Sequence, residues 1–431
     1  MKRFTVFFLV IPVLLVCFSC SRQHVGEVEI FGHTVQADAV EITFSGNEIP
    51  GISELSANLK LLTKLEKVDL GSFHMFEEEM RSLSDEFPGV TFEYIPYVSV
   101  AGRVLPNDVE SLDLSGSPVT DDLTNLLKAF PLLKSINLHD TGMRREQLLE
   151  LKSTYPDLIV KADVELAGEL FSTESEELDL NSREIRNPDE FMESLMLFNR
   201  LSKVEMCDCG LSNEELAAIR DTYPDTKFVW RIHLGKWSLR TDAVAFSVLI
   251  TKFNYQRMTS EDIEVLKYCT DLRALDLGHQ AITDISVIGE YLTDLRVLIL
   301  ADNKITDLSP LANLPHLHYL EFFMNRVKDL TPLAQCRELV DLNISYNPGL
   351  SDITPLLDLP ILERLWMVSV AVSRADTALL RKTYPDVTLV NTGYGSTGSG
   401  WRTHNRYFAM IDMYHKQDYI SEEFSKYDGM R

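Results

Sequence analysis

The fold is decided by residues 272–361, which divide into four consecutive copies of one pattern: LRALDLGHQAITDISVIGEYLTD, LRVLILADNKITDLSPLANLPH, LHYLEFFMNRVKDLTPLAQCRE and LVDLNISYNPGLSDITPLLDLPI. The copies are 23, 22, 22 and 23 residues long, and each opens with leucine and further apolar residues at fixed spacing. Repetition at this period indicates structural units that bury their apolar sides only against one another. The sequence therefore predicts a solenoid.

Each copy contains signals for one short strand and one helical turn. In the second copy Leu295, Leu298 and Leu300 alternate with other residues, as in a strand with one buried face. Asn303 follows at the expected turn, where its amide can bond backbone groups that lack a ladder partner. On the far side, a hydroxyl residue before a proline is predicted to start and cap a helical turn. This dipeptide recurs as Ser309-Pro310, Thr331-Pro332 and Thr354-Pro355.

The position after the strand is polar in all four copies, which carry Gln280, Asn303, Asn325 and Asn347 there. The resulting pattern L-x-x-L-x-L-x-x-N resembles the leucine-rich repeat, and the continuation N-x-I-x-D-L-S/T-P-L resembles its bacterial internalin-type subclass. The resemblance implies an α/β solenoid: a leucine-rich repeat superhelix with parallel strands on the concave face and short helices or helical turns on the convex face. It also implies that the concave face binds another macromolecule.

Residues 28–250 repeat at a longer period. Pro88, Pro156 and Pro224 follow an aromatic residue and lie 68 residues apart. Each unit opens with alternating apolar residues around a glycine and continues as strand, helix, strand, helix, strand. The spacing of the strands favours one continuous curved solenoid. The glycine segments are compatible with further coils or with protruding hairpins, and the sequence leaves both open.

The amino terminus is typical of a secretion signal, because two basic residues precede an apolar stretch too short for an ordinary membrane-spanning helix. Ser19-Cys20 resembles the lipobox of bacterial lipoproteins. This resemblance implies cleavage before Cys20, attachment of lipid to its thiol and a membrane-anchored position at the bacterial cell surface. Ordinary cleavage, which gives a secreted protein, is the alternative.

The predicted organisation has five parts. They are a signal peptide (1–19), a lipid anchor and short linker (20–27), three irregular superrepeats with the start of a fourth (28–250), regular internalin-type repeats (251–390), and a Gly/Ser link with a C-terminal capping segment (391–431).

The charge of the chain argues against nucleic acid as a partner. Lysine and arginine number 41 against 65 aspartates and glutamates, a formal net charge of −24. A phosphate backbone needs a basic face, and an anionic membrane would repel this body. Six cysteines are too few to hold 431 residues together, so the fold must depend on a hydrophobic core.

The stretch GYGSTGSG, residues 393–400, contains the glycine spacing of a dinucleotide-binding loop. Such a site needs a βαβ unit with an acidic residue at the end of the next strand, and Asp418 lies in a polar tail instead. The composition favours a flexible link to a helix that places Tyr407, Met410, Ile411 and Tyr414 on one face and caps the last coil. A nucleotide-binding enzyme remains a remote alternative.

No other segment predicts catalysis, a cofactor or a metal site. Cys209 takes the Asn place of the repeat pattern, and Cys207 is expected to face outward from a strand. No second cysteine pair matches them, so a metal site is not predicted.

The concave face is the predicted interaction site. Aromatic and apolar residues could form a nearly continuous exposed patch there, and Trp, Tyr and Arg are frequent binding anchors. The candidate residues are Val297, Ile299, Tyr319, Glu321, Phe323, Met324, Tyr346, Arg364 and Trp366. A protein partner is the first expectation, and a glycan stacked on Tyr319 and Trp366 is the second. The competing interpretation is that flanking coils, loops or the C-terminal segment cover the patch.

Overall fold

The computed structural model describes residues 26–120, 122–248 and 257–419. The predicted signal peptide and Cys20 lie outside these residues. Contacts divide the chain into two compact units, Met1–Ala162 and Asp163–Arg431. Among the described residues, no helix combines the length and the apolar character needed to cross a membrane.

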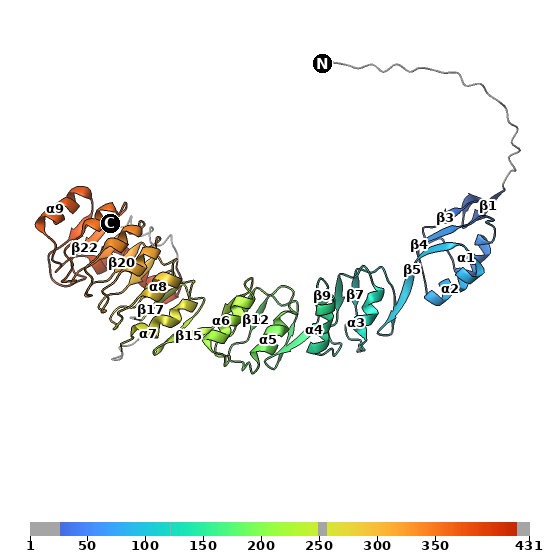
Figure 1. Ribbon diagram of the computed structural model, residues 1–431, viewed down its shortest axis with the longest axis horizontal. Coiled ribbons are helices and arrows are strands. Elements are labelled where there is room, and N and C mark those ends of the chain that lie inside the picture. Colours follow the sequence, from blue (N-terminus) through green and yellow to red (C-terminus); the bar gives the residue numbers. More distant parts are fainter. Residues whose placement is uncertain (1–25, 121, 249–256, 420–431) are drawn as a thin grey trace, which may run out of the picture. The chain divides into compact units, whose positions relative to one another are not determined.

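The first unit contains two blocks that share one long strand (Figure 1). The first block comprises β1 (Glu27–Ile30), β2 (His33–Gln36), β3 (Glu41–Thr43), α1 (Ile52–Leu59), β4 (Lys67–Met75), α2 (Glu77–Glu86) and β5 (Thr91–Val100). The second comprises β6 (Arg103–Pro106), β7 (Ser111–Asp113), α3 (Leu123–Leu126), η1 (Leu127–Ala129), β8 (Ser135–Asn137), α4 (Arg145–Thr154) and β9 (Ile159–Lys161). Strand β5 pairs in parallel with β4 and then antiparallel with β6, so it ends one block and begins the next.

The second unit begins with a block of the same order. It comprises β10 (Asp163–Leu166), β11 (Glu169–Ser172), β12 (Glu177–Asp179), α5 (Pro188–Leu195), β13 (Lys203–Glu205), α6 (Asn213–Thr222) and β14 (Lys227–Val229). The hairpin β15 (Arg231–Leu234) and β16 (Trp237–Arg240) then leads into the regular coils.

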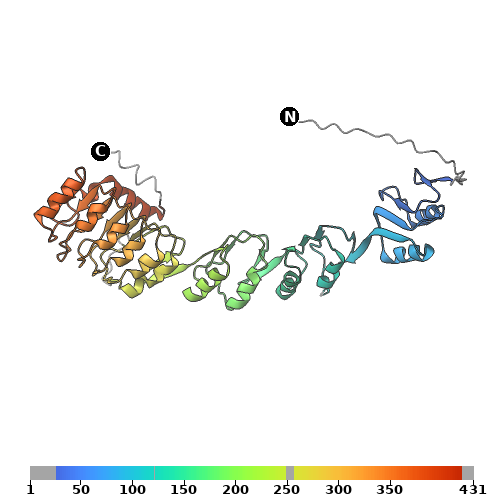
Figure 2. The same cartoon turned by 45° about the horizontal axis from the view of Figure 1, so that its top comes forward.

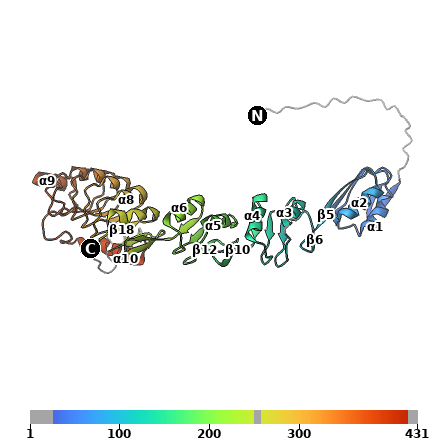
Figure 3. The same ribbon diagram turned by 60° about the horizontal axis from the view of Figure 1, so that its bottom comes forward.

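The regular coils form one seven-stranded parallel sheet in chain order (Figure 2). Its strands are β17 (Ala245–Ser247), β18 (Ala274–Asp276), β19 (Val297–Ile299), β20 (Tyr319–Glu321), β21 (Asp341–Asn343), β22 (Arg364–Trp366) and β23 (Thr388–Val390). The returning segments carry α7 (Ser260–Ile263), η2 (Glu264–Tyr268), α8 (Ser286–Tyr291), η3 (Ser309–Asn313), η4 (Thr331–Gln335), η5 (Thr354–Asp358) and α9 (Arg374–Thr383). After β23 come η6 (Trp401–Thr403) and α10 (Asn405–Lys416), and Figure 3 shows α8 and α10 on opposite sides of the sheet. Parallel strands backed by short helices confirm the predicted fold class.

The asparagine at each coil corner satisfies backbone groups, as predicted. The Asn303 Nδ2 donates to the carbonyl oxygens of Leu277 at 2.9 Å and Leu300 at 3.1 Å, and its Oδ1 accepts from the Ile282 amide at 3.0 Å. Asn325 and Asn347 repeat these bonds in the next two coils. A ladder of buried amides therefore joins neighbouring coils where the strands end.

The helical turns are capped by aspartates, so the predicted hydroxyl cap is wrong. Asp307 Oδ1 accepts from the backbone amide of Ser309 at 2.8 Å and from its hydroxyl at 2.6 Å. Asp329 and Asp352 do the same two residues before Thr331 and Thr354. A carboxylate accepts a hydrogen bond more strongly than a hydroxyl and also interacts favourably with the helix dipole. These bonds hold the pKa of each aspartate below its usual range.

The 68-residue signature has a structural cause in its tyrosine. The Tyr155 hydroxyl donates to the Thr124 carbonyl oxygen at 2.9 Å, and Tyr223 makes the equivalent bond to Met192. Tyr384 bonds Leu356 at 2.8 Å in the regular coils. Each tyrosine follows the second helix of a pair and ties its end to the preceding helix or turn. The tyrosine before proline thus fixes the spacing of the two returning segments in these three places, whereas Phe87 in the first copy has no hydroxyl to make the bond.

The glycine segments form antiparallel hairpins with two-residue turns, which decides between the two open arrangements. In three of them both turn residues have positive φ, as at Ala167 (48°) and Gly168 (82°). This geometry matches the twist of paired strands and favours glycine at the second turn position. The hairpins separate the parallel strands into distinct sheets, so the expected uninterrupted solenoid is wrong for the described residues.

Candidate functional site

Strand register brings most of the predicted patch onto one face of the sheet. The register aligns Val297 of β19 with Tyr319 of β20. Two strands beyond β20, Arg364 of β22 occupies the same position. Ile299 is similarly aligned with Glu321 and Trp366, and Phe323 follows β20 on the same face. The prediction that these residues share a surface of the sheet is therefore consistent with the register.

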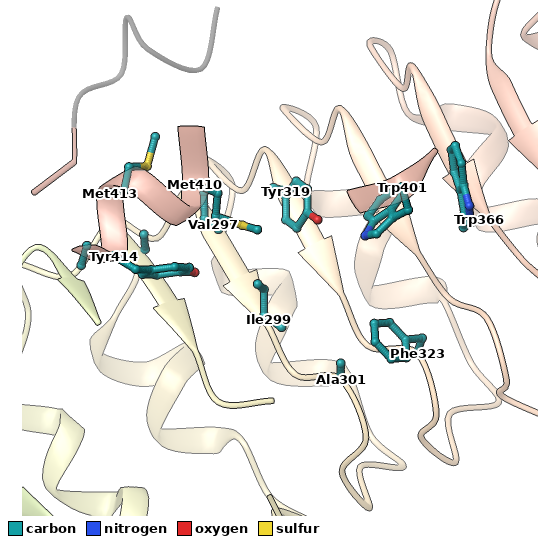
Figure 4. Close-up of a cluster of buried hydrophobic side chains, with 12 residues drawn as sticks. Val297, Ile299, Ala301, Tyr319, Phe323, Trp366, Trp401, Met410, Met413 and Tyr414 are labelled. Carbon is teal, nitrogen blue, oxygen red and sulfur yellow. The ribbon is translucent and has the colours of Figure 1, made fainter. Parts of the chain in front are cut away.

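The patch is covered, so the prediction that it is exposed is wrong. Val297, Tyr319 and Glu321 are 0% exposed, and Ile299, Phe323, Arg364 and Trp366 are all 4% exposed or less. The cover is the chain's own C-terminal segment, as the competing interpretation proposed. Its buried residues Trp401, Met410, Met413 and Tyr414 form one cluster with the strand residues (Figure 4). We call residues 401–416 the docked segment.

Met324 and Tyr346 lie elsewhere than the other candidates. Both have positive φ at the turn after a strand, 57° and 55°. Met324 is 45% exposed and Tyr346 is partly exposed. They are the only members of the predicted patch that are open to solvent, and they do not join the covered face.

The indole of Trp401 fills the centre of the covered face. Its ring centroid lies 5.4 Å from that of Tyr319 and 5.0 Å from that of Trp366. The Arg364 guanidinium lies 4.5 Å from the Trp401 centroid and 5.2 Å from that of Trp366, within cation–π distance of both rings. The two aromatic side chains proposed as stacking platforms for a glycan are therefore occupied by a third aromatic ring.

A buried ion network fastens the start of α10. Asp341 is 0% exposed and accepts from Arg364 at 3.0 Å and from Arg406 at 2.7 Å. Arg406 also pairs with Glu363 at the edge of the face, and Arg364 donates to the Trp401 carbonyl oxygen at 3.0 Å. Burial raises the pKa of Asp341 to about 6, although both arginines oppose that shift.

Glu321 receives a second set of donors from the docked segment. Its Oε1 accepts from the Trp401 indole nitrogen at 2.8 Å and from the Tyr319 hydroxyl, and its Oε2 lies 3.5 Å from Arg402. Burial, together with this carboxylate, raises the pKa of Tyr319 well above its usual value. Glu321 Oε2 and the Tyr414 hydroxyl are buried without a hydrogen-bond partner among the described residues.

The glycine-rich stretch serves as a turn between β23 and the docked segment. The Ser396 and Gly398 carbonyl oxygens accept from Asn343 and Trp366, both at 2.8 Å. A Cβ at Gly398 would lie 2.6 Å from the Tyr394 carbonyl oxygen, and Gly395 has a φ of 78°. Steric demands of the turn thus account for the glycine spacing. In the described residues after this loop, up to Tyr419, no strand completes a βαβ unit.

The C-terminal helix forms as predicted but covers a different surface. Met410 and Tyr414 are buried, while Tyr407 and Ile411 are only partly buried. Met413, which was not predicted, is buried as well. Helix α10 contacts β17 and β18 and crosses the strand face, so it does not extend the stack beyond the last coil.

Cys207 and Cys209 are both buried and free, so Cys207 is not exposed at the strand surface where it was predicted to lie. Burial raises the pKa of both thiols, which disfavours the reactive thiolate. Across residues 26–120, 122–248 and 257–419, no group of three or more histidines, cysteines or carboxylates could hold a metal ion.

Sequence reasoning missed Asp341, Glu363, Trp401, Arg402 and Arg406 as members of one constellation. A signal was present in the composition, because the docked segment carries three basic residues against one acidic residue in a strongly acidic chain. Basic and aromatic residues at helical spacing, opposite a strand face with carboxylates, could have suggested the contact.

The strand face of the preceding block is different, because the outward residues of its first strand, β12, are open, although Val229 at the aligned position of β14 is buried. In β12, Glu177 and Asp179 are exposed. In β13, Glu205 accepts from Lys203 at 2.6 Å and from Arg240 at 2.9 Å. Hydrogen bonds from these cations hold the pKa of Glu205 well below its usual range. This acidic surface is accessible to another molecule.

Comparisons with known proteins agree on the repeat. Residues 293–335 match the family model for leucine-rich repeats in two copies. A comparison with curated protein sequences gave no match.

Similar solved structures include an internalin of Listeria monocytogenes, with 17% identity over 85% of this chain and 87% of that chain and a TM-score of 0.31. A leucine-rich repeat protein of Leptospira interrogans has 17% identity over 82% of this chain and 95% of that chain, with the same TM-score. Internalin C2 of Listeria monocytogenes has 21% identity over 64% of this chain and 84% of that chain, with a TM-score of 0.28. Because these scores are low, they carry no argument, and the family match together with the coil geometry shows leucine-rich repeats in this part of the chain.

Proposed function

We propose that this chain is a non-catalytic surface lipoprotein of bacteria that binds a protein partner through the strand faces of its leucine-rich repeats. The observation that carries the proposal is the open part of the β12–β14 strand face, where Glu177 and Asp179 of β12 project into solvent. Outward side chains of a rigid parallel sheet form an ordered surface, and ordered polar surfaces give specificity to association.

The charge of this face selects the class of partner. Glu177, Asp179 and Glu205 are acidic, while Lys203 and Arg240 are engaged with Glu205, and Lys227 of β14 is engaged with Asp271. The whole chain is also strongly negative, with a formal charge of −24. A protein with a basic surface would therefore associate fastest, because the long-range field steers it toward the face.

The binding proposal is tested by capture from the cell envelope with a soluble chain that lacks the signal peptide and Cys20, residues 21–431. We expect a captured protein to be lost, by about tenfold, when Glu177→Lys and Asp179→Lys are combined. The matched control is Asp189→Lys with Glu193→Lys, which makes the same charge change on the exposed surface of α5. Equal capture by both double variants would exclude this strand face.

Membrane attachment is proposed through Cys20, from the lipobox-like sequence alone. The test is incorporation of labelled fatty acid by cells that express the full chain. We expect labelling to be abolished by Cys20→Ser and retained with Cys17→Ser. Two acyl chains would give stable anchoring, so Cys20→Ser should also move the protein to the soluble fraction.

A further inference from the structure

The docked segment and the face it covers have opposite charge. The face carries Asp276, Glu321 and Asp341, all buried beneath the segment, with Glu363 at the edge. The segment brings Arg402 and Arg406 to these carboxylates. In a chain with so large an acidic excess, this basic segment is complementary to the surface it meets.

The path of the segment differs from that of an end cap. A cap covers the apolar side of the last coil, where the stack would otherwise continue. Here the chain leaves β23, places Trp401 between Tyr319 and Trp366, and then runs back so that α10 contacts β17 and β18. The segment therefore lies across the face that leucine-rich repeats offer to other molecules, in the position of a ligand.

The contacts of the segment give specificity more than stability. Buried ion pairs such as Arg406–Asp341 lose much of their Coulombic gain to desolvation. The Tyr414 hydroxyl is buried at this interface without a hydrogen-bond partner among the described residues, and Glu321 Oε2 has only the 3.5 Å ion pair with Arg402. Unsatisfied buried groups weaken an interface. Net docking is thus less favourable than apolar burial alone would make it.

The link to the segment permits release without disturbing the coils. Residues 391–400 hold four glycines, and the Tyr394 side chain in this stretch is 100% exposed. Side chains of the sheet anchor the link through two hydrogen bonds, to the carbonyl oxygens of Ser396 and Gly398. The Asn303 and Asn325 ladders do not involve the segment, so the coils keep their own bonds when it leaves.

We propose that the strand face of β17–β22 is a receptor site for a basic, aromatic, amphipathic helix of a partner protein, and that the docked segment occupies it as a displaceable internal ligand. A bound helix would place an aromatic ring between Tyr319 and Trp366 and a guanidinium against Asp341. Its apolar residues would then pack over Ala274 and Val297. This is recognition of a helix in a groove. It rests on the proposed protein-binding function and names one class of partner for it.

Because the docked segment is tethered to the sheet, the tether determines how tightly a partner helix must bind in order to displace it. A short flexible link holds the internal ligand at an effective concentration of roughly millimolar, so it competes strongly. A partner helix can bind only those chains whose docked segment has left the face. Its apparent affinity is therefore its intrinsic affinity multiplied by the fraction of open chains. A substitution that weakens only the docking of the chain's own segment should therefore increase the apparent affinity for a partner helix.

The test uses the full chain and a fluorescent peptide of residues 398–416 as the probe. Arg406→Glu in the chain places a carboxylate against Asp341 and Glu363, so its own segment should leave. We expect the peptide to bind this variant at least tenfold more tightly than the wild-type chain. The matched control is Lys416→Glu, the same charge change at the exposed end of α10, which should bind like wild type. A peptide that itself carries Arg406→Glu should bind neither chain.

Hydrogen exchange on the same proteins makes the outcome decisive. In the wild-type chain, amides of α10 should exchange through an opening that leaves β18–β20 protected, and the Arg406→Glu chain should retain that protection. Exchange of α10 only together with the sheet would overturn the proposal, as would loss of protection of β18–β20 in the variant. The proposal would also be overturned if the Arg406→Glu chain kept β18–β20 protected, released its own α10 and still failed to bind the peptide. None of these results depends on capture by β12–β14, so the two proposals fail separately.

Discussion

The strand faces of β12–β14 and β17–β22 are built from the same kind of coil, with a short parallel strand and a returning helix or turn. They differ in the exposure of their outward side chains to solvent. In β12 the outward residues Glu177 and Asp179 remain exposed, whereas in β20 the outward Tyr319 and Glu321 are fully buried. The backbone pattern is parallel and in register in both. What differs is the side chains and the presence of a segment that returns to cover one face.

This contrast shows that a repeat pattern specifies the surface but not its exposure. Ion pairs on the open face remain partly solvated, as in Lys203–Glu205, where both side chains are more than 20% exposed. On the covered face Arg406 and Asp341 are almost completely buried. Charge pairs of similar geometry should therefore differ greatly in what their loss costs.

The largest expected effect comes from Trp401→Ala, which removes the centre of the covered face. The substitution leaves a cavity between Tyr319 and Trp366 and takes the indole donor from Glu321. We expect a loss of about 3–5 kcal/mol in the free energy of unfolding of the segment and its sheet. Chemical denaturation measures it, with Phe408→Ala, an exposed residue of α10, as the control. A loss below about 1 kcal/mol would show that the segment contributes little to the fold.

The asparagine ladder should give the next largest effect. Asn325→Ala leaves the Ile305 amide without its buried acceptor, and it removes one of two side-chain donors from the Leu300 and Phe322 carbonyl oxygens, which keep Asn303 and Asn347. At roughly 1–3 kcal/mol for the unsatisfied amide, with a smaller loss at each carbonyl, we expect a loss of about 3 kcal/mol. Asn181→Ala should cost less, about 2 kcal/mol, because it removes the acceptor of the Cys207 amide but its donor bond goes to the side chain of Glu205 and to no backbone carbonyl. Equal losses in thermal denaturation would contradict the distinction between the two regions.

Much of the coil was predictable because its determinants are local. Leucine spacing indicated the strands, and Asn303 and Asn325 were correctly placed at corners where backbone groups need partners. The capping aspartates, such as Asp307, were missed because Ser309-Pro310 is itself a good helix start, and only geometry shows which oxygen reaches the amide. The hairpin turns were visible as glycines, but their effect on sheet continuity was not.

Exposure of the patch was not predictable from periodicity. The bond from Trp401 to Glu321 joins residues 80 positions apart, and no repeat pattern encodes a contact at that separation. Amphipathicity of residues 405–416 predicted a buried helix face, but several surfaces were available for it. The strand face was chosen by matched charge, since Arg406 reaches Asp341, and such pairing appears only when both elements are in place.

A smaller effect, dependent on pH, should distinguish the covered face from the open one. Asp276 is buried, and burial raises its pKa to about 6 against hydrogen bonds from Gly278 and Ser247. Since its unfolded value is near 3.9, the folded chain binds the extra proton between these values, and stability from this group falls as the pH rises through about 6. Asp276→Asn removes this titration while its Oδ1 keeps the bond from the Gly278 amide and its new NH2 group can donate to the Ser247 hydroxyl, which donates to Asp276 in the wild-type chain.

Relative to wild type, the Asp276→Asn chain should therefore gain about 1 kcal/mol between pH 5 and pH 7. Asp341 titrates in both chains and cancels in the comparison. Denaturation midpoints at the two pH values measure the gain. A difference between wild type and Asp276→Asn that does not vary with pH would mean that Asp276 is hydrated in solution.

The smallest effect should come from the exposed ion pairs of the first unit. Lys134 and Glu110 lie 2.6 Å apart, yet their side chains are 69% and 61% exposed. Solvent screening and the entropy of ordering two long side chains offset most of the attraction, so Lys134→Ala should change stability by less than about 0.5 kcal/mol. Arg364→Ala, which leaves Asp341 buried with one partner fewer, should cost several times more. If urea denaturation gave similar losses for both, burial by the docked segment would not be what separates the two faces, and the covered face would be as wet as the open one.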